Sequence, residues 1–126
     1  MTMTKNVIIA DDREGTRTQY EGLIRERVND VTIEEASDGQ ILVDKVREKR
    51  LREGRYDLIL TDYRMPNLDG ISAIREIRAF DPATPIYLLS ADKVEDEAIK
   101  AGATGFLSKK GGGVGKLVET ILKHLG

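Results

Sequence analysis

The stretch from Leu58 to Gly70 reads LILTDYRMPNLDG, and its first half decides the fold class. Three apolar residues, Leu58 to Leu60, are followed by Thr61 and then by the acidic Asp62. A short and fully apolar run is typical of a strand that helices cover on both faces, as in a parallel α/β sheet. Ligands of open parallel sheets bind beyond the carboxyl ends of the strands, so Asp62 lies where chemistry is expected.

Three further apolar runs end in polar residues in the same way. The residues that follow these runs are Asp11 and Asp12, Ser90, and Lys109. Because the carboxyl ends of parallel strands meet at one edge of a sheet, we expect these side chains to converge with Asp62. The sequence therefore predicts a site of three carboxylates, a hydroxyl and an ammonium.

Longer segments between these runs have the period of amphipathic helices. The expected helices cover about 16–28, about 40–53, a segment spacing Ile71, Ile74 and Ile77 three apart, about 94–101, and a last segment from Val114. Gly54 is predicted to end the second helix and Gly102 the fourth. Residues 32–36 combine apolar and charged side chains, as is typical of a strand at the edge of a sheet. The fold class predicted is α/β, a doubly wound five-stranded parallel sheet with five helices, in one domain over 1–126.

Composition excludes several classes of protein. The net charge of -2 argues against direct nucleic-acid binding, and the absence of cysteine excludes disulfides and thiolate metal sites. The first apolar run is too short for a signal peptide or a membrane span, so no membrane insertion and a cytoplasmic location are expected. A basic cluster at 47–55 is interrupted by Glu48 and Glu53, and it is interpreted as a solvated helix face rather than an anion site.

The predicted site has the composition of a phosphoryl-transfer centre. Asp11, Asp12 and Asp62 would repel one another within a few ångströms unless a cation neutralised them, and hard oxygen ligands suit magnesium, with manganese as an alternative. Lys109 adds positive charge and Ser90 a hydroxyl, which together suit a tetrahedral dianion beside the metal. A carboxylate that accepts a phosphoryl group fits all five residues.

The sequence resembles the receiver domain of bacterial two-component response regulators. The resemblance covers nearly the whole chain and rests on the motifs Asp11-Asp12, Asp62 to Gly70, Ser90-Ala91, Gly102 to Phe106, and Lys109, in the family's order. It implies a flavodoxin-like sheet with strand order 2-1-3-4-5. It also implies a single-domain regulator similar to those of chemotaxis, which is a signalling module rather than an enzyme.

The resemblance implies roles for the predicted site residues. Asp62 would be the phosphoacceptor, receiving its phosphoryl group from a histidine kinase or a histidine phosphotransfer protein. Asp12 and Asp62 would bind magnesium directly, Asp11 through water, and Arg64 through its backbone carbonyl. Lys109 would pair with the phosphoryl group.

The same resemblance implies a switch. Ser90 would move to hydrogen-bond the phosphoryl group, and Phe106 would turn inward, which remodels the face formed by the fourth helix, fifth strand and fifth helix. The output would be a changed affinity for a downstream protein, from a monomer or from a dimer formed on activation. Because the chain ends with the last helix, that output is expected from a separate protein.

Two departures from the family pattern stand out. Proline usually follows the conserved lysine through a cis bond, but here Lys110 and three glycines follow Lys109, so this peptide is either trans or held cis at a cost of about 2.5 to 4 kcal/mol. We hypothesise that the glycines make this loop mobile before phosphorylation. The span from Asp12 to Asp62 is also longer than is common, which an extended second helix explains.

A further hypothesis concerns the mouth of the site. Arg64 follows Asp62 by two residues and Asp92 follows Ser90 by two residues. We expect these side chains to form an ion pair over the phosphoryl group that hinders the hydrolytic water.

Alternatives remain for several residues. Asp11 and Asp12 could cap the first helix, and Asp69 is interpreted as a cap or turn residue of the third. His124, the sole histidine, is interpreted as a surface residue near a helix C-terminus. An aspartate-nucleophile phosphohydrolase would share the acidic site but would need an Asp-x-Asp pair and a substrate cap. A receiver cut from a hybrid kinase or a transcription factor would keep the same chemistry.

Overall fold

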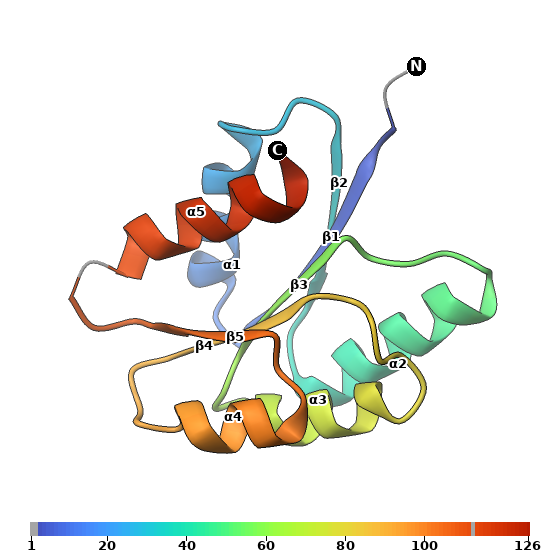
Figure 1. The fold of residues 1–126 in the computed structure, drawn as a ribbon, viewed down its shortest axis with the longest axis vertical. Helices are drawn as coiled ribbons and strands as arrows, with labels where there is room; N and C mark the ends of the chain where they lie inside the picture. The colour runs from blue at the N-terminus through green and yellow to red at the C-terminus, as the bar shows by residue number, and fades with distance from the viewer. Residues whose placement is uncertain (1–2, 112) are drawn as a thin grey trace.

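A computed structural model describes residues 3–111 and 113–126, and in it a parallel sheet lies between two layers of helices (Figure 1). The elements in chain order are β1 (Lys5–Ala10), α1 (Glu14–Arg25), β2 (Val31–Ala36), α2 (Gly39–Leu51), β3 (Leu58–Asp62), α3 (Gly70–Arg78), β4 (Ile86–Ser90), α4 (Glu95–Ala101), β5 (Gly105–Ser108) and α5 (Gly113–Leu125). The five strands are parallel, in the order β2-β1-β3-β4-β5. The predicted fold class and strand order are confirmed.

Each inner strand sends alternate side chains into two cores. Ile8 and Ile59 enter the core beneath α2, α3 and α4, whereas Val7, Ile9 and Leu58 enter the core beneath α1 and α5. Figure 1 shows these two helix layers on opposite sides of the sheet. Because both faces of these strands are buried, their sequences are continuously apolar. The mixed β2 segment is an edge strand, as predicted.

The first helix is displaced from its predicted limits of 16–28. It runs from Glu14 to Arg25, and its N-cap is Arg13, which makes no side-chain capping bond. Neither Asp11 nor Asp12 therefore caps α1. Val28 is buried beyond the end of the helix, where its N–H still donates to the carbonyl oxygen of Ile24 at 2.9 Å. That tightened last turn accounts for the apolar periodicity that continues to Val28.

The second helix ends at Leu51, earlier than predicted, and Gly54 is not the residue that turns the chain. Glu53 adopts a left-handed φ of 61° instead. The N–H groups of Glu53 and Gly54 donate to the carbonyl oxygens of Arg50 and Lys49, which satisfies the last turn of α2. The prediction extended the helix two residues too far, to 53, because glycine is the usual left-handed residue beyond a helix end.

Two other helix ends agree with the sequence. Asp69 caps α3, since its side chain accepts a hydrogen bond from the N–H of Ser72 at 2.8 Å. Gly102 ends α4 with a φ of 115°. In the part of the chain that the structure describes, no helix is long and apolar enough to cross a membrane.

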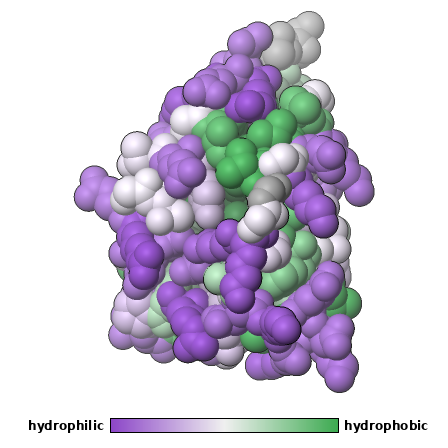
Figure 2. Space-filling view, turned by 90° about the vertical axis from the view of Figure 1, so that its left-hand side faces the viewer, coloured by the Kyte–Doolittle hydropathy of each residue, from purple (hydrophilic) through white to green (hydrophobic). Residues whose placement is uncertain are grey.

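The surface is mostly hydrophilic, and much of the basic cluster is paired. Figure 2 shows a small apolar patch on the face that carries the connection from β5 to α5, and the exposed apolar residues of α5 are Val114 and Leu122. In α2, Lys49 pairs with Glu34 at 3.0 Å and Arg52 pairs with Glu48 at 2.6 Å. The interpretation of this cluster as a solvated helix face agrees with these local pairs.

Candidate functional site

Three carboxylates converge at the carboxyl end of the sheet. Asp11 directly follows β1, Asp12 comes next, and Asp62 is the last residue of β3. The neighbouring strands pair Ala10 with Thr61, which brings these residues to the same level. One carboxylate oxygen from each of the three residues lies within 4.8 Å of the others. The convergence expected from the sequence is present.

Asp11 is the most buried member of this cluster, with 1% of its surface exposed. Its Oδ1 accepts a hydrogen bond from the backbone N–H of Arg13 at 2.9 Å. Its Oδ2 has no hydrogen-bond partner among the described residues. Burial raises the pKa of Asp11, and the charges of Asp62 and Asp12 act in the same direction against the Arg13 N–H and Lys109. A buried carboxylate oxygen without a partner is what a cation would satisfy.

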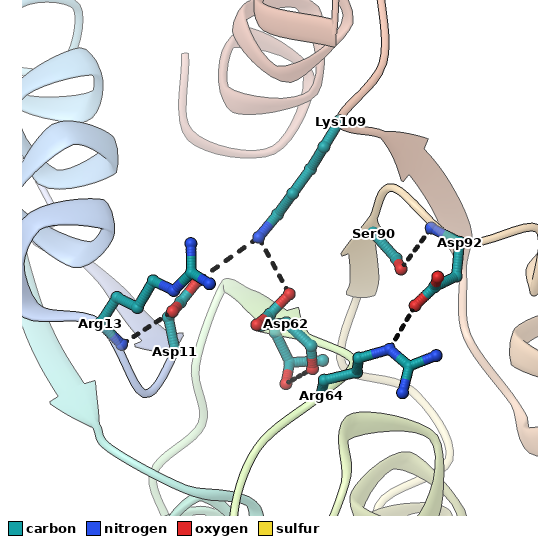
Figure 3. A network of polar contacts seen from close by, with 8 residues as sticks. Asp11, Arg13, Asp62, Arg64, Ser90, Asp92 and Lys109 are labelled. Carbon is teal, nitrogen blue, oxygen red and sulfur yellow. Dashed lines mark hydrogen bonds and ion pairs between the residues drawn. The ribbon is translucent and has the colours of Figure 1, made fainter.

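Lys109 crosses the cleft from the end of β5 to the acidic cluster, as Figure 3 shows. Its Nζ lies 2.9 Å from Oδ1 of Asp62 and 3.6 Å from Oδ2 of Asp11. Partial burial alone would lower the pKa of Lys109, but the hydrogen bond to Asp62 and the nearby negative charges raise it. The side chain is therefore a stable ammonium facing the carboxylates.

The loop after Lys109 lacks both the proline and the cis peptide bond of the family pattern. Every peptide bond in the described residues is trans, including the one between Lys109 and Lys110. The backbone N–H of Lys109 donates to the carbonyl oxygen of Ser90 at 2.9 Å, which fixes where the lysine leaves the sheet. Of the three glycines predicted to make this loop mobile, Gly112 lies outside the described residues.

The opposite wall of the cleft is formed by β4 and the loops beside it. The hydroxyl of Ser90 is buried at the end of β4, where its Oγ accepts a hydrogen bond from the N–H of Asp92 at 3.0 Å. Nε of Arg64 donates to Oδ2 of Asp92 at 2.7 Å, so the expected ion pair spans the mouth of the site (Figure 3). The hydrogen bond to Arg64 lowers the pKa of Asp92, although desolvation opposes this effect.

These side chains line one open cleft of about 370 Å³. The lining residues are Asp12, Arg13, Asp62, Arg64, Ser90, Ala91, Asp92 and Lys109. Phe106 is not among them. It is half-buried and lines a neighbouring hollow of about 340 Å³, whose wall also includes Ala91 and Asp92. The loop after Ser90 thus lies between the cleft and Phe106.

The structure places three residues of the first helical region near the site that the sequence did not assign to it. Arg13 lines the cleft, and Nη1 of Arg17 donates to the backbone carbonyl oxygen of Asp11 at 2.8 Å. Tyr20 lines a second cavity together with Lys109. The only sign of their position in the sequence is that they closely follow Asp12, at and beyond the start of α1.

The cluster fits a divalent cation. Three carboxylates face one ammonium, so negative charge remains for a metal ion to neutralise. Carboxylate oxygens beside an open cleft suit magnesium, which prefers hard oxygen ligands and retains waters. The unpartnered oxygen of Asp11 is an independent sign of the same fit.

His124 has a contact that the sequence did not indicate. Its Nε2 lies 2.8 Å from the phenol oxygen of Tyr87, which joins α5 to β4. Burial lowers the pKa of His124, and the charge of Lys123 acts in the same direction. The residue is therefore a structural contact on α5, away from the acidic cluster.

Comparisons with known proteins agree with this geometry. The sequence model of one protein family, the response regulator receiver domain, matches residues 7–122 of this chain. The two-component response regulator ORR41 of Oryza sativa is 34% identical over 106 residues, which cover 82% of this chain and 81% of that protein. The transcriptional regulatory protein ZraR of Klebsiella oxytoca is also 34% identical, but the match spans only 23% of its length and 82% of this chain.

A solved structure shows the same fold with a metal in place. The receiver domain of the sensor histidine kinase PA1611 from Pseudomonas aeruginosa has a magnesium ion coordinated in its active site cleft. It is 27% identical to this chain, with a TM-score of 0.79 over 98% of this chain and 99% of that one.

Proposed function

This chain belongs to the response regulator receiver domain family, and we propose that it is a phosphorylation-controlled signalling module whose phosphoacceptor is Asp62. One observation carries the proposal. The Asp62 carboxylate lies within 4.8 Å of the carboxylates of Asp11 and Asp12 and within 2.9 Å of the Lys109 ammonium. Next to such a carboxylate a metal ion can bind, and the Lys109 ammonium can stabilise the negative charge of a phosphoryl group transferred to it.

The proposed reaction is a phosphoryl transfer from a histidine kinase or a histidine phosphotransfer protein. A carboxylate oxygen of Asp62 attacks phosphorus, an O–P bond forms, and the N–P bond of the donor phosphohistidine breaks as the imidazole leaves. Lys109 pairs with the transferred phosphoryl oxygens. Asp12 and Asp62 would hold magnesium directly, with Asp11 acting through water and Arg64 through its backbone carbonyl. Bound there, the ion would neutralise charge on the transferring oxygens.

The proposed output is a change in affinity for another protein. Ser90 is buried beside the cleft, and its present partner is the N–H of Asp92. If the Ser90 hydroxyl turns to the phosphoryl group, the Asp92 N–H loses its acceptor and the loop before α4 must adjust. Phe106 borders that loop, so its rearrangement would alter the surface of α4, β5 and α5. A change of this kind supports either a new partner or a dimer formed on activation.

The rim pair has a proposed role in the lifetime of the phosphoryl group. Arg64 and Asp92 close one side of the cleft mouth through a hydrogen bond of 2.7 Å. A water that hydrolyses the acyl phosphate has to approach phosphorus opposite Asp62. The pair narrows this approach and so slows dephosphorylation.

Magnesium and beryllofluoride, a mimic of the phosphoryl group, provide the decisive experiment. We expect magnesium-dependent shifts in the amide spectrum around Asp62, Ser90 and Phe106 in the wild type. The Asp62→Ala variant should show no such shifts, while the control Asp44→Ala, an exposed position on α2, should respond like the wild type. No response in the wild type would contradict the proposed phosphoacceptor role of Asp62.

A further inference from the structure

The hydrogen-bonding groups of Asp11 are held by contacts at all but one atom. Its backbone N–H donates to the carbonyl oxygen of Ala36, the last residue of β2, at 3.0 Å. Its Oδ1 accepts from the N–H of Arg13 (Figure 3), and its backbone carbonyl oxygen accepts from Nη1 of Arg17 at 2.8 Å. The remaining oxygen, Oδ2, lies 3.6 Å from Nζ of Lys109 and has no hydrogen-bond partner among the described residues. Asp11 is therefore fixed except at the oxygen that faces Lys109.

Of these contacts, the one to the carbonyl oxygen comes from a side chain. Arg17 is in the first turn of α1, and 15% of its side chain is exposed. While its Nη1 reaches Asp11, its Nε donates to Oε1 of Glu35 on β2 at 2.8 Å. The planar guanidinium thus joins the edge strand of the sheet to the loop that carries Asp11 and Asp12, and it uses a different nitrogen for each contact.

The Arg17 contact bears on both carboxylates of this loop. The carbonyl group of Asp11 belongs to the peptide unit that also contains the N–H of Asp12, and such a unit is planar. A donor that fixes the carbonyl oxygen therefore also fixes the direction in which the chain enters Asp12. Magnesium demands near-ideal octahedral geometry, so its affinity depends on where its carboxylate ligands are placed.

We propose that Arg17 is a positioning residue for the magnesium site and that Glu35 holds Arg17 in place. Arg17 fixes the peptide unit between Asp11 and Asp12, which keeps both carboxylates within reach of an ion that Asp62 also binds. The charge of Arg17 does not provide this benefit, because a nearby cation repels a divalent ion. The inference rests on the proposed function, in which the acidic cluster binds magnesium.

Arg17→Lys tests positioning while it keeps the positive charge. Lysine has one donor nitrogen in place of the two that reach Asp11 and Glu35. In a magnesium titration followed by the amide spectrum, the affinity should fall by about threefold to tenfold, the effect of one lost hydrogen bond. Arg25→Lys is the matched control, because Arg25 lies at the other end of α1 and also pairs with a glutamate, Glu21, so its affinity should equal that of the wild type. A wild-type affinity in Arg17→Lys would overturn the inference.

Amide hydrogen exchange in the metal-free protein locates the effect. In Arg17→Lys the N–H of Arg13, which donates to Oδ1 of Asp11, should exchange about threefold to tenfold faster than in the wild type. The N–H of Ser72 is an internal control, since it makes an equivalent hydrogen bond to Asp69 at 2.8 Å and should keep its wild-type exchange rate. A loss of affinity without faster exchange at Arg13 would show that Arg17 does not act through the loop, which would also overturn the inference.

A double-mutant cycle with Glu35→Ala tests the second contact of the guanidinium. Glu35→Ala should weaken magnesium binding in the wild type and should have a smaller effect once Arg17 is replaced by lysine. Equal effects in both backgrounds would mean that Glu35 acts through its charge and does not hold Arg17. If the wild type binds no magnesium, the proposed function fails, whereas the exchange rates of the metal-free protein still decide whether Arg17 fixes the loop.

Discussion

The two walls of the cleft are held by different kinds of contact. On the side of β1 and β3, Asp11 is 1% exposed and is fixed by a backbone N–H, while Arg17 holds the carbonyl oxygen of the same residue. On the side of β4, the rim pair joins an Arg64 side chain that is 77% exposed to an Asp92 side chain that is 39% exposed. We call the first the fixed wall, and we expect the second, the free wall, to be the one that rearranges.

The free wall continues into α4, whose C-terminal end is tied to α3. Nε of Arg78 donates to the carbonyl oxygen of Gly102 at 2.7 Å, which ties the C-terminal end of α4 to α3. The N-cap residue Val94 makes no side-chain capping bond but packs against the core, and α4 is only seven residues long. We expect a rearrangement that begins at Ser90 to reach α4 at the end nearest to it.

The largest effect should come from the fixed wall, through Asp11→Asn. Asparagine keeps an acceptor for the Arg13 N–H but removes a buried charge beside Asp12 and Asp62, so magnesium affinity should fall by about tenfold to a hundredfold. Without metal, the variant should be at least as stable as the wild type, because it no longer buries a negative charge that Asp62 and Asp12 repel. Thermal unfolding with and without magnesium measures both effects.

Asp44→Asn serves as the control for this substitution, since Asp44 is an exposed carboxylate on α2, away from the cleft. Its unfolding midpoint should rise with magnesium as that of the wild type does, because an ion that binds only the folded protein stabilises it. If Asp11→Asn also rises by the wild-type amount, the fixed wall does not hold the metal and the comparison of the two walls fails.

The contrast between the walls was only partly predictable from the sequence. Continuous apolar runs indicate the buried strands that lead to Asp11, Asp62 and Ser90, because helices cover both faces of such strands. The convergence of their polar ends then follows from parallel strand geometry. The strand order came from the family resemblance, since periodicity does not say which strands are neighbours.

The contributions of helix side chains were harder to foresee. Tyr20 fits the apolar stripe of α1, and a stripe does not reveal that this residue also lines a cavity together with Lys109. Arg78 looks like a surface residue in a helical pattern, yet its guanidinium secures α4. The left-handed conformation of Glu53 was not predicted, because the neighbouring Gly54 is the residue type that usually adopts it. The hydrogen bonds that end α2 form with Glu53 in this conformation. Each of these depends on distant or non-standard contacts that local patterns do not encode.

Ser90→Ala tests the free wall with an intermediate effect. Phosphorylation of Asp62 should continue within a few-fold of the wild-type rate, whereas the amide shifts of Phe106 and α4 with beryllofluoride should largely disappear. The unfolding free energy should fall by about 1 kcal/mol, because the Asp92 N–H loses its acceptor. Ser108→Ala is a matched control, since Ser108 pairs with Ser90 across β4 and β5 and its Oγ accepts from the N–H of Lys110. A full spectral response in Ser90→Ala would show that the wall moves without this hydroxyl.

The smallest effect is expected from Arg64→Ala, which removes the rim pair alone. Water should reach phosphorus more easily, so dephosphorylation should speed up by roughly twofold to fivefold, with no measurable change in stability because the pair is exposed.

Since Arg64 lowers the pKa of Asp92, the ion pair stays charged at neutral pH and is lost only as the pH falls through that lowered pKa. The rate difference should therefore be constant between pH 6 and pH 8, about two units or more above the ordinary range of an aspartate. Arg52→Ala removes another exposed ion pair, between Arg52 at the C-cap of α2 and Glu48, and should leave the rate unchanged. An unchanged rate in Arg64→Ala as well would mean that the rim does not control the water, and the free wall would then act on signalling through Ser90 alone.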